Sequence, residues 1–345
     1  MKININLHIQ NEIEFKSIQE LSDSLFHQSH ILIISEKNIF ELYPFLFNNN
    51  IPKIILDIHE KNKNIETAIE LWKKLIEHNI TKHHQIYIIG GGVLNDIALF
   101  TCSVFKRGVH CISVPTTLLS MVDASIGGKN GVNFAELKNI LGTIYIPEKN
   151  IIVEEFLKTL PKEQLLSGWA EILKIALVLD NEFYNECIHF LKSNINPDKS
   201  IIQKAIELKI SVIQNDLQDN HQRQLLNFGH TIAHAIEQTF ESKNIYIPHG
   251  IAVANGIIIE SFIAQQMNIL SNNDYQTIKN DFQNIFPKIN LSEHDIEQII
   301  QKITHDKKNT PNSINFTLIE KIGKGKIKIP VTTQIIKTAL HNFIF

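Results

Sequence analysis

The stretch QIYIIGGGVLNDIALF, residues 85–100, joins a short apolar run to three consecutive glycines and then to a segment with helical character. The run at 85–90 predicts a buried strand, and Asp96 falls in the first turns of the helix that follows. Glycines let backbone amides approach a phosphate closely, and a helix N-terminus favours negative charge. The pattern is neither G-x-G-x-x-G nor a P-loop, because Asn95 and Asp96 stand where those motifs need other residues. This stretch alone leaves open both a phosphate-binding turn and a plain strand-to-helix turn.

Similar β-branched runs flank this stretch on both sides. They are HILIIS at 30–35, KIILDI at 53–58 and HCISVP at 110–115, and helix-length segments such as 65–79 alternate with them. This alternation predicts βαβ units and a parallel sheet. From about Pro161 the apolar period becomes 3.6 and strand signals are few. Because 345 residues exceed the ~250–300 at which one core stops growing, we expect an α/β domain over 1–150 and a mostly α-helical domain over 151–345.

Charge and cysteine content narrow the class of protein. With 33 Lys+Arg against 36 Asp+Glu, the chain shows no broad basic field of the kind that nucleic-acid binding needs. It has no uncharged apolar run long enough to span a membrane and no apolar core of a signal peptide. The three cysteines form no C-x-x-C spacing, and their odd number argues against a disulfide framework. We therefore expect a cytoplasmic protein without nucleic-acid or membrane partners.

A second glycine-containing segment, VPTTLLSMVDASIGGKNGVN at 114–133, carries hydroxyl, carboxylate and ammonium groups. Thr116 and Thr117 follow a predicted strand, and Asp123 and Lys129 flank a pair of glycines. Long loops in compact domains are often functional, but a solvated loop whose glycines serve only its turns is the alternative. Lys138 and Asn139 follow at a distance compatible with the same pocket.

Histidines and one glutamate could form a metal site in the second half. His230 and His234 lie four apart and share one face of a helix, but 16 histidines give ~0.7 such pairs by chance. His249 follows in PHG, and Glu171 offers an oxygen. One oxygen and two imidazoles leave a divalent ion with open positions for substrate. The alternative for Glu171 is an ordinary surface ion pair with Lys174 at i+3.

The stretch ELKISVIQNDLQDNHQRQLLN at 207–227 carries a further group of polar residues. If one helix ran unbroken through it, five of them would fall near one side, and a solvated helix face is the alternative. They are Lys209, Asp216, Asp219, Arg223 and Asn227.

A set of ordered segments resembles the dehydroquinate synthase family in sequence and in spacing. The segments are GGGVLNDIALF, KRG, VPTTLLSMVDASIGGKNGVN, LKNILGTIYIP, FLKTLP, SGWAEILK, LLNFGHTIAHAIE, PHG and DKK, and the match runs from about His30 to residue 308. The resemblance implies an NAD-binding α/β domain followed by a helical metal-binding domain, in a homodimer. It also implies an enzyme that converts a seven-carbon sugar-acid phosphate, 3-deoxy-D-arabino-heptulosonate 7-phosphate, to 3-dehydroquinate and phosphate. In this family NAD acts catalytically, and the metal is usually zinc or cobalt.

The resemblance also assigns expected roles to single residues of this chain. Glu171, His230 and His249 match the metal ligands, and Arg107 matches a phosphate-binding arginine that reaches across the dimer interface. The positions that match NAD contacts are Glu60, Lys63, Gly91, Gly92, Val93, Leu94, Asn95, Asp96, Thr116, Thr117, Lys129, Lys138, Phe156, Leu157, Lys158 and Thr159. The positions that match the substrate site are Arg107, Asp123, Lys129, Lys138, Asn139, Lys174, Lys209, Asp219, Arg223, Asn227, His234 and Lys307.

Several positions depart from the family pattern. The family usually has Gly where Asn95 and Leu99 stand; Asn tolerates positive φ, whereas Leu99 adds bulk at a close helix contact. The other departures are Asn130, Leu217, Asp219, His221 and Ile251. No matched metal ligand or phosphate-binding base is missing, so we expect activity, with cofactor affinity the property most affected.

Three other functions remain in competition with this interpretation. A related sugar-phosphate cyclase would differ at substrate positions such as Lys209, Arg223 and Asn227. A polyol or iron-type alcohol dehydrogenase would perform net redox chemistry and would more typically have Asp in place of Glu171. A non-enzymatic binding module would lack one of the metal ligands.

Overall fold

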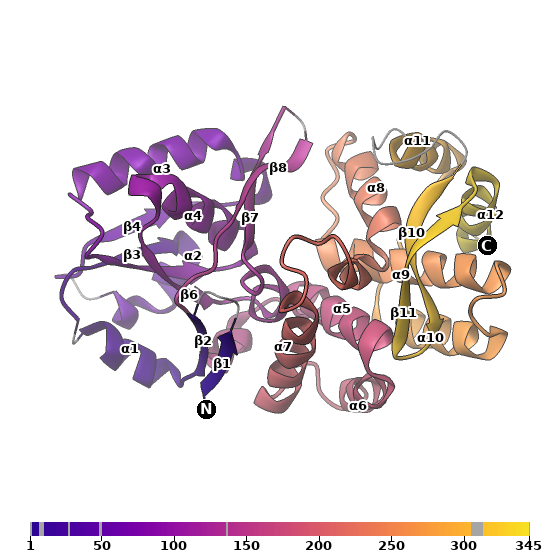
Figure 1. Ribbon diagram of the computed structural model, residues 1–345, viewed down its shortest axis with the longest axis horizontal. Coiled ribbons are helices and arrows are strands. Elements are labelled where there is room, and N and C mark those ends of the chain that lie inside the picture. Colours follow the sequence, from indigo (N-terminus) through magenta and orange to yellow (C-terminus); the bar gives the residue numbers. More distant parts are fainter. Residues whose placement is uncertain are drawn as a thin grey trace. The chain divides into compact units, whose positions relative to one another are not determined.

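The computed structural model describes residues 2–6, 10–26, 28–47, 50–135, 137–304 and 313–344. The chain forms two compact units, Met1–Leu160 and Pro161–Phe345 (Figure 1). Residue 150, where composition places the boundary, falls within strand β9 (Lys149–Ile152). This strand pairs with strands of the first sheet, so the first unit continues past it to Leu160.

The described part of the first unit is built on a seven-stranded sheet in the order β1-β2-β9-β6-β5-β3-β4. Its pairs are parallel except β1 with β2, which confirms the predicted parallel sheet. The four runs identified in the sequence are β3, β4, β5 and β6. The bounds are β1 (Lys2–Asn6), β2 (Gln10–Phe15), β3 (Ile31–Glu36), β4 (Lys53–Leu56), β5 (Gln85–Gly90) and β6 (His110–Pro115).

Helices α3 and α4 cover one face of this sheet, and Figure 1 shows α1 beyond the other. Leu94, Ile97 and Ala98 of α4 have no exposed surface and join one core cluster with residues of β3 and β5. Each buried Leu or Ile side chain contributes roughly 1.5–3 kcal/mol, so α4 is held firmly at the end of β5. The helices are α1 (Ile18–Phe26), α2 (Lys37–Leu42), α3 (Ile65–Glu77) and α4 (Gly92–Val104), with the short helices η1 (Pro44–Leu46), η2 (Glu60–Asn62), η3 (Phe105–Arg107), η4 (Ser120–Ala124) and η5 (Glu154–Thr159).

A hairpin of β7 (Lys129–Phe134) and β8 (Leu137–Ile144) stands apart from the main sheet. It packs on α4 through fully buried Val132 and through a hydrogen bond of 2.9 Å between the hydroxyls of Ser103 and Thr143. From the sequence we expected a loop within 114–133. The structure instead forms a π-helical turn, η4, and then the hairpin.

The second unit is mostly helical, as predicted. Helix α9 is buried along nearly its whole length and packs against α5, α8, α10 and α12, and α5 is similarly enclosed. The helices are α5 (Lys162–Leu179), α6 (Asn181–Leu191), α7 (Lys199–Ile213), α8 (His230–Glu241), α9 (His249–Gln266), α10 (Asn272–Ile285), α11 (Glu293–Thr304) and α12 (Thr333–Ile344), with the short helix η6 (Gln222–Asn227).

One glycine sets the contact between α9 and α5. A Cβ on Gly250 would lie 2.1 Å from the carbonyl oxygen of Ser167, and the Gly250 N–H donates to the Ser167 hydroxyl at 2.8 Å. Only glycine lets the two backbones approach this closely. The contact brings the first residue of α9, His249, next to the middle of α5.

A second hairpin was not predicted from the sequence. Strands β10 (Ile314–Lys321) and β11 (Lys324–Val331) pair antiparallel around a turn in which Gly323 has φ 87°. In β11 partly buried and exposed residues alternate along most of the strand, so only one face of it is half-covered. Such a strand carries a weaker apolar signal than the buried strands of the first unit.

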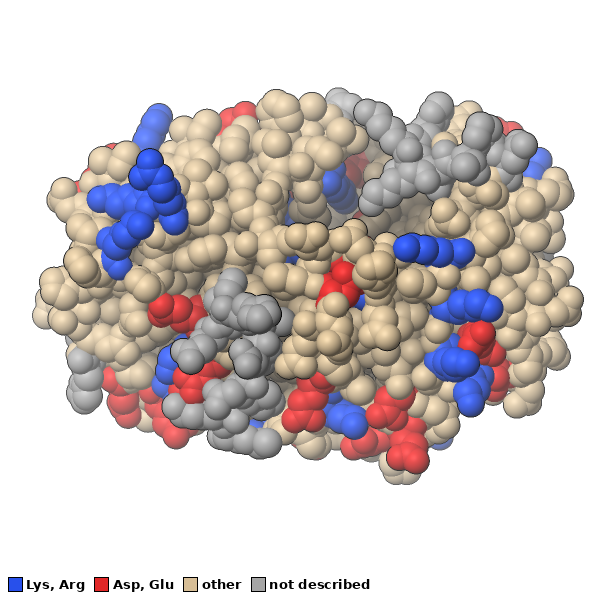
Figure 2. All heavy atoms as spheres, in the orientation of Figure 1, with Lys and Arg blue, Asp and Glu red and all other residues tan. Residues whose placement is uncertain are grey.

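Charged side chains lie in several places on the face drawn in Figure 2. Figure 2 shows Lys and Arg side chains interspersed with Asp and Glu along the lower part of the face drawn. Among the described residues, no helix combines the length and the apolar character needed to cross a membrane.

Candidate functional site

Three side chains from three helices of the second unit converge on one point. Glu171 lies in the middle of α5, and His230 and His249 are the first residues of α8 and α9. Glu171 Oε1 lies 3.6 Å from His230 Nε2 and 3.6 Å from His249 Nε2. Two donors that each sit ~2.1 Å from one tetrahedral ion are ~3.4 Å apart. The spacing therefore fits three ligands of one divalent ion.

The hydrogen bonding of Glu171 supports the same interpretation. Its side chain has no exposed surface, and Oε2 pairs with Lys174 Nζ. Among the described residues, Oε1 has no hydrogen-bond partner. A buried carboxylate oxygen left without a partner is costly, and a cation between it and the two imidazoles would satisfy it.

The charges around these ligands set their protonation. Burial raises the pKa of Glu171, but Lys174 and His249 outweigh it and bring the pKa to about 2. Burial, aided by Lys174, lowers the pKa of His230 well below its ordinary value, so this ring is neutral at pH 7. Burial also lowers the pKa of His249, but Glu237 and Glu171 raise it to about 10. An ion that binds here must therefore displace a proton from His249.

His234 lies beside the three ligands without joining them. Its ring centroid is 5.3 Å from that of His230 and 6.1 Å from that of His249. The side chain is exposed, one turn along α8 from His230. The ring is therefore accessible to solvent beside the three ligands.

The polar residues between 209 and 227 do not lie on one unbroken helix, so the condition for a shared helix face is not met. Helix α7 ends at Ile213, and the chain then turns around buried Asp216. The Asp216 carboxylate accepts the backbone N–H groups of Asn220 (2.9 Å), His221 (2.6 Å) and Arg223 (3.0 Å). Burial raises the pKa of Asp216, but these three donors outweigh it and the pKa falls below its ordinary value. Asp216 therefore builds the loop.

The matched substrate residues of this region differ in burial. Lys209 and Arg223 are only 4% and 5% exposed, so a solvated helix face does not describe them. The Arg223 guanidinium donates through Nη1 to the Leu217 carbonyl at 2.7 Å. Asp219 is half-buried with φ 62°, and Asn227 is exposed. Lys307 lies outside the described residues.

In the first unit, the triple-glycine stretch forms the junction between β5 and α4. Gly91 is the N-cap of α4, and its N–H donates to Glu36 Oε1 at 2.8 Å. A Cβ on Gly91 would lie 3.1 Å from Thr117 Cγ2, so the turn is closely surrounded. The Thr116 N–H donates to the Gly90 carbonyl at 3.0 Å, while its buried hydroxyl oxygen has no hydrogen-bond partner among the described residues. The turn thus offers a helix N-terminus and an unused hydroxyl to a ligand.

Three further residues at positions that match NAD contacts of the family, Glu60, Lys63 and Asp96, lie beside this turn. Lys63 Nζ lies 2.5 Å from Asp96 Oδ2, on the first turns of α4. Burial raises the pKa of Asp96, with Lys63 opposing that rise. Glu60 Oε1 accepts the Asn133 side-chain amide at 3.2 Å, and the Asn133 N–H donates to the Lys63 carbonyl at 2.7 Å. Val93 is half-buried, whereas Leu94 points into the core.

The matched residues at 156–159 are anchored by packing. Phe156 and Leu157 are buried, and the Phe156 ring lies 5.0 Å from that of Tyr43 in a T-shaped contact. The Thr159 hydroxyl is hydrogen-bonded to the Tyr43 hydroxyl at 2.8 Å, and Lys158 is exposed.

The other matched residues of the first unit lie on its turns and hairpin. Arg107 is exposed in the turn after α4, where its φ is 66°. Asp123 is part of the π-helical turn η4. Lys129, Lys138 and Asn139 belong to the hairpin, where the Asn139 N–H donates to Asn133 Oδ1 at 2.9 Å.

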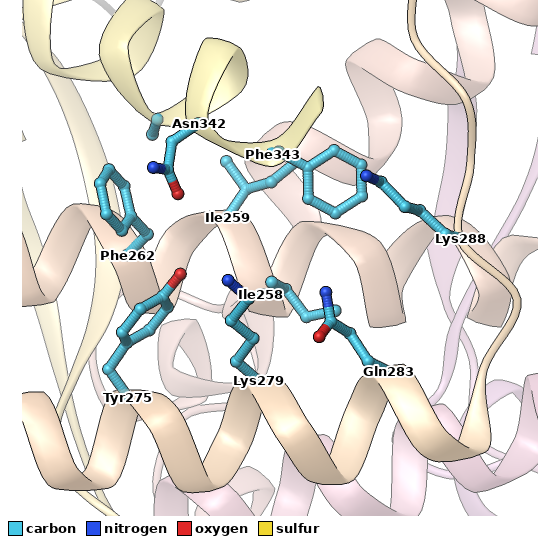
Figure 3. Close-up of a pocket in the computed structure, with 10 residues that line it drawn as sticks. Ile258, Ile259, Phe262, Tyr275, Lys279, Gln283, Lys288, Asn342 and Phe343 are labelled. Atoms are coloured by element: carbon cyan, nitrogen blue, oxygen red, sulfur yellow. The ribbon is translucent and has the colours of Figure 1, made fainter. Parts of the chain in front are cut away.

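A small pocket of the second unit contains none of these residues. It has a volume of about 40 Å³ and lies between α9, α10 and α12, with Tyr275 and Lys279 on one side (Figure 3). Its lining residues do not include a matched ligand or substrate position. This pocket is therefore distinct from the point where Glu171, His230 and His249 converge.

Two family models cover most of the chain. The model described as 3-dehydroquinate synthase N-terminal matches residues 53–167, and the one described as 3-dehydroquinate synthase C-terminal matches residues 168–309. The chain belongs to the 3-dehydroquinate synthase family. The 3-dehydroquinate synthase of Picrophilus torridus is 35% identical over 326 residues, covering 93% of this chain and 92% of the relative. That of Pyrococcus furiosus is 37% identical over 291 residues, covering 84% of each chain.

Solved structures of sugar-phosphate cyclases share the fold of this family member. A 2-deoxy-scyllo-inosose synthase complexed with carbaglucose-6-phosphate, NAD⁺ and Co²⁺ has a TM-score of 0.88 at 24% identity, covering 99% of this chain and 100% of that one. A 2-epi-5-epi-valiolone synthase from Streptomyces hygroscopicus with bound NAD⁺ and Zn²⁺ has a TM-score of 0.84 at 25% identity, covering 96% of each.

The structure accounts for two departures from the 3-dehydroquinate synthase family pattern. Asn95 lies inside α4 and does not have a positive φ. The ability of Asn to adopt a positive φ therefore does not explain its presence at this position. Its buried amide donates to the carbonyls of Gly90 and Gly91, each at 3.0 Å. Leu99 is 1% exposed within the main core cluster of the first unit, so its bulk is accommodated by packing.

Four site residues were missed from the sequence. Glu237 follows His230 and His234 at i+7 and i+3, and this shared helix face is a signal that could have found it. Glu36 ends β3 beside the glycine turn, as the parallel pairing of β3 with β5 would predict. Asn133 and Glu260 carry no comparable signal; Glu260, on α9, accepts the N–H groups of Gly229 and Ile232 on either side of His230.

Proposed function

We propose that this chain catalyses the 3-dehydroquinate synthase reaction, converting 3-deoxy-D-arabino-heptulosonate 7-phosphate to 3-dehydroquinate and phosphate. The observation that carries this proposal is the convergence of Glu171, His230 and His249 around a buried oxygen without a hydrogen-bond partner, in a chain that both family models match. The three residues would hold one divalent cation, zinc or cobalt.

NAD is the second cofactor that the residues fit. The N-terminus of α4 offers backbone N–H groups and a favourable dipole for a pyrophosphate, next to the unused hydroxyl of Thr116. Lys63, Asp96 and Glu60 lie together beside this turn. When bound, the nicotinamide would take and return one hydride at the substrate's carbinol carbon, and the cation would polarise the carbinol oxygen.

The residues of the second unit would bind and orient the substrate. Lys174 is held against Glu171 and has 1% exposure, so it is fixed beside the ligands. Lys209 and Arg223 are buried cations suited to the phosphate or carboxylate of the substrate. In the balanced reaction the oxidised carbinol acidifies the neighbouring C–H, a proton leaves that carbon, and the C–O bond to phosphate breaks. The hydride then returns to the carbon that lost it. One C–C bond closes the ring, so there is no net oxidation. The contribution of the protein is then mainly positional and electrostatic.

The partner that we propose is a second copy of the chain. The hairpin exposes four apolar side chains, Phe134, Leu137, Ile140 and Ile144, each 45–55% exposed. Tyr145, which follows β8, donates its hydroxyl to the Val109 carbonyl at 2.5 Å, two residues from Arg107. The exposed apolar side chains of the hairpin and Arg107 therefore lie in the same region of the first unit. A dimer through this face would cover the apolar side chains and could carry Arg107 to the partner's phosphate site.

We also propose a cytoplasmic enzyme that acts without nucleic-acid or membrane partners. Cys102, Cys111 and Cys187 are all unpaired buried thiols, which is typical of a reducing compartment. The formal charge of −3 gives no attraction to a polyanion.

Phosphate release from the heptulosonate phosphate tests this function. With NAD present, we expect stoichiometric phosphate and 3-dehydroquinate, a loss of both after chelation, and recovery on addition of zinc or cobalt. A hexose phosphate and a different heptulose phosphate serve as comparison substrates. Turnover of one of these in place of the heptulosonate phosphate would identify another sugar-phosphate cyclase and overturn the proposal.

A further inference from the structure

Two buried carboxylates stand behind the candidate metal ligands. Glu237 on α8 is 8% exposed, and Glu260 on α9 has no exposed surface. Neither lies in the group formed by Glu171, His230 and His249. Glu237 reaches from α8 to the first residue of α9, and Glu260 reaches from α9 to the first turn of α8. Both contacts therefore affect the positions of the two histidine ligands.

Glu237 contacts the ring of His249. Its Oε1 lies 3.0 Å from His249 Nδ1, while Nε2 of the same ring faces Glu171 Oε1 at 3.6 Å. A neutral imidazole has one N–H, and donating it from Nδ1 to a carboxylate leaves the Nε2 lone pair for a cation. Glu237 thereby selects the tautomer and holds the ring plane that metal binding needs.

Glu260 contacts the backbone on both sides of His230. Its two oxygens accept the N–H of Gly229 at 2.7 Å and the N–H of Ile232 at 3.1 Å. These are N–H groups at the N-terminus of α8, where no acceptor exists within the helix itself. Burial raises the pKa of Glu260 to about 8, with the backbone donors opposing that rise. In either protonation state both oxygens can accept these N–H groups, whereas a glutamine offers one oxygen only.

The backbones of α8 and α9 leave little room for adjustment at this point. Gly229 has φ 82°, and a Cβ on Gly256 would lie 2.1 Å from the Gly229 carbonyl oxygen. The start of α8 is therefore pressed against α9 and clamped there by Glu260. A shift of this turn would move the side chain of His230, which projects from it.

From these contacts we infer that Glu237 and Glu260 are reciprocal positioning residues: the α8 carboxylate orients the α9 histidine, and the α9 carboxylate fixes the turn that carries the α8 histidine. The inference rests on the proposed metal role of Glu171, His230 and His249. It places neither glutamate in contact with the ion. His234, Glu237 and His249 also lie close enough to hold a cation, but the inferred donation of the His249 Nδ1–H to Glu237 leaves that nitrogen no lone pair for one.

The test measures metal affinity in the full-length chain by competition with a chelating dye, using Co²⁺ and Zn²⁺. Glu237→Gln and Glu260→Gln are compared with Glu241→Gln, a matched change at the exposed last residue of α8. We expect affinity to fall by ~10–100-fold in the first two variants, as for other outer-sphere partners, and to change less than ~2-fold in the control. Titrations run well below the unfolding midpoint of each metal-free variant, because a purely structural role would lower that midpoint and leave affinity unchanged. If Glu237→Gln fails to fold, Glu237→Asp replaces it, since the shorter side chain draws the carboxylate back from His249.

The outcomes separate this inference from the proposed function. Suppose that the wild type binds one metal, that Glu171→Gln loses it, and that Glu237→Gln and Glu260→Gln bind it as tightly as the wild type. This result would overturn the inference and leave the proposed function intact. Two metals per chain, one lost in Glu237→Gln, would make Glu237 a ligand and also overturn it. A wild-type chain that binds no metal would remove the proposed metal centre and the inference with it.

Discussion

The side chain of Asn95 accepts a hydrogen bond of 2.5 Å from the hydroxyl of Ser113, which joins α4 to β6 behind the glycine turn. Both residues are fully buried. With its amide group Asn95 also holds the carbonyls of Gly90 and Gly91. A position that is usually glycine in the family therefore fixes the shape of the turn in this chain.

We expect Asn95→Ala to lower the free energy of unfolding by about 1–3 kcal/mol, because it leaves buried partners without a hydrogen bond. NAD affinity should fall as well, since the turn loses its support. Urea unfolding and a nucleotide titration measure the two effects. Asn280→Ala, at an exposed position within α10, is the matched control and should change stability by less than about 0.5 kcal/mol. An Asn95→Ala protein as stable as the wild type would contradict this role.

Glu171→Gln should fold but lose the metal and most of its turnover. The amide oxygen still accepts a hydrogen bond from Lys174, but this buried ammonium loses its counter-charge, so the expected loss of stability is about 3–5 kcal/mol. The exposed Glu163→Gln, in the first turn of the same helix, controls for the substitution. Metal content and phosphate release are the measurements. Wild-type turnover of Glu171→Gln at limiting metal would show that the ligand assignment is wrong.

The nicotinamide should show no net reduction during turnover, because substrate and product are at the same oxidation level and the hydride returns. Absorbance at the wavelength of the reduced nicotinamide is followed together with phosphate release. A steady rise proportional to product would favour a polyol or iron-type alcohol dehydrogenase instead.

Mixing Arg107→Ala with Glu171→Ala tests the proposed dimer. If Arg107 completes the phosphate site of the partner subunit, a mixed dimer has one site with both defects and one with neither. After mild dissociation and reassembly, activity should then rise to about a quarter of the wild-type value in a random mixture, an estimate that follows from the two-fold symmetry of the dimer. No recovery, or full activity of a monomer, would show that Arg107 serves its own subunit.

The acid stability of the second unit should depend on Asp295. This buried carboxylate accepts the N–H and hydroxyl of Ser292 at 2.9 and 2.6 Å at the start of α11, and pairs with Lys243 after the end of α8. Burial raises the pKa of Asp295, but Lys243 and Ser292 outweigh it, and the net shift is downward from 3.8.

A lowered pKa in the folded state means that the contribution of Asp295 is present above about pH 4 and is lost as pH falls through the folded value. We expect Asp295→Asn to cost about 1–3 kcal/mol at pH 7. The difference from the wild type should shrink below pH 4 in urea unfolding. A constant difference across this range would exclude the ion pair as its source.

Local sequence predicted the features that depend on short-range pattern. Buried parallel strands are continuous apolar runs, so β3 to β6 could be located, and the glycine stretch marked the start of α4. Glu171, His230 and His249 were selected by residue type and family resemblance, and the structure brings their donor atoms together. The hairpin β10–β11 was missed because the half-covered strand β11 carries a weak apolar signal. An unbroken helix through 209–227 does not form, because three backbone N–H groups bind Asp216 and end the helical path.

The supporting contacts of the site depend on residues far apart in the chain, which local pattern cannot reveal. Asn95 is held by Ser113, Glu260 by the start of α8, and His249 lies beside Glu171 because Gly250 lets α9 touch α5. The energetic reason is the same in each case. A buried polar group needs a hydrogen-bond partner, and the packing of helices and strands determines which residue supplies it. Residue type thus predicted which groups could bind the ion and nucleotide, while packing determined which other side chains hold them in place.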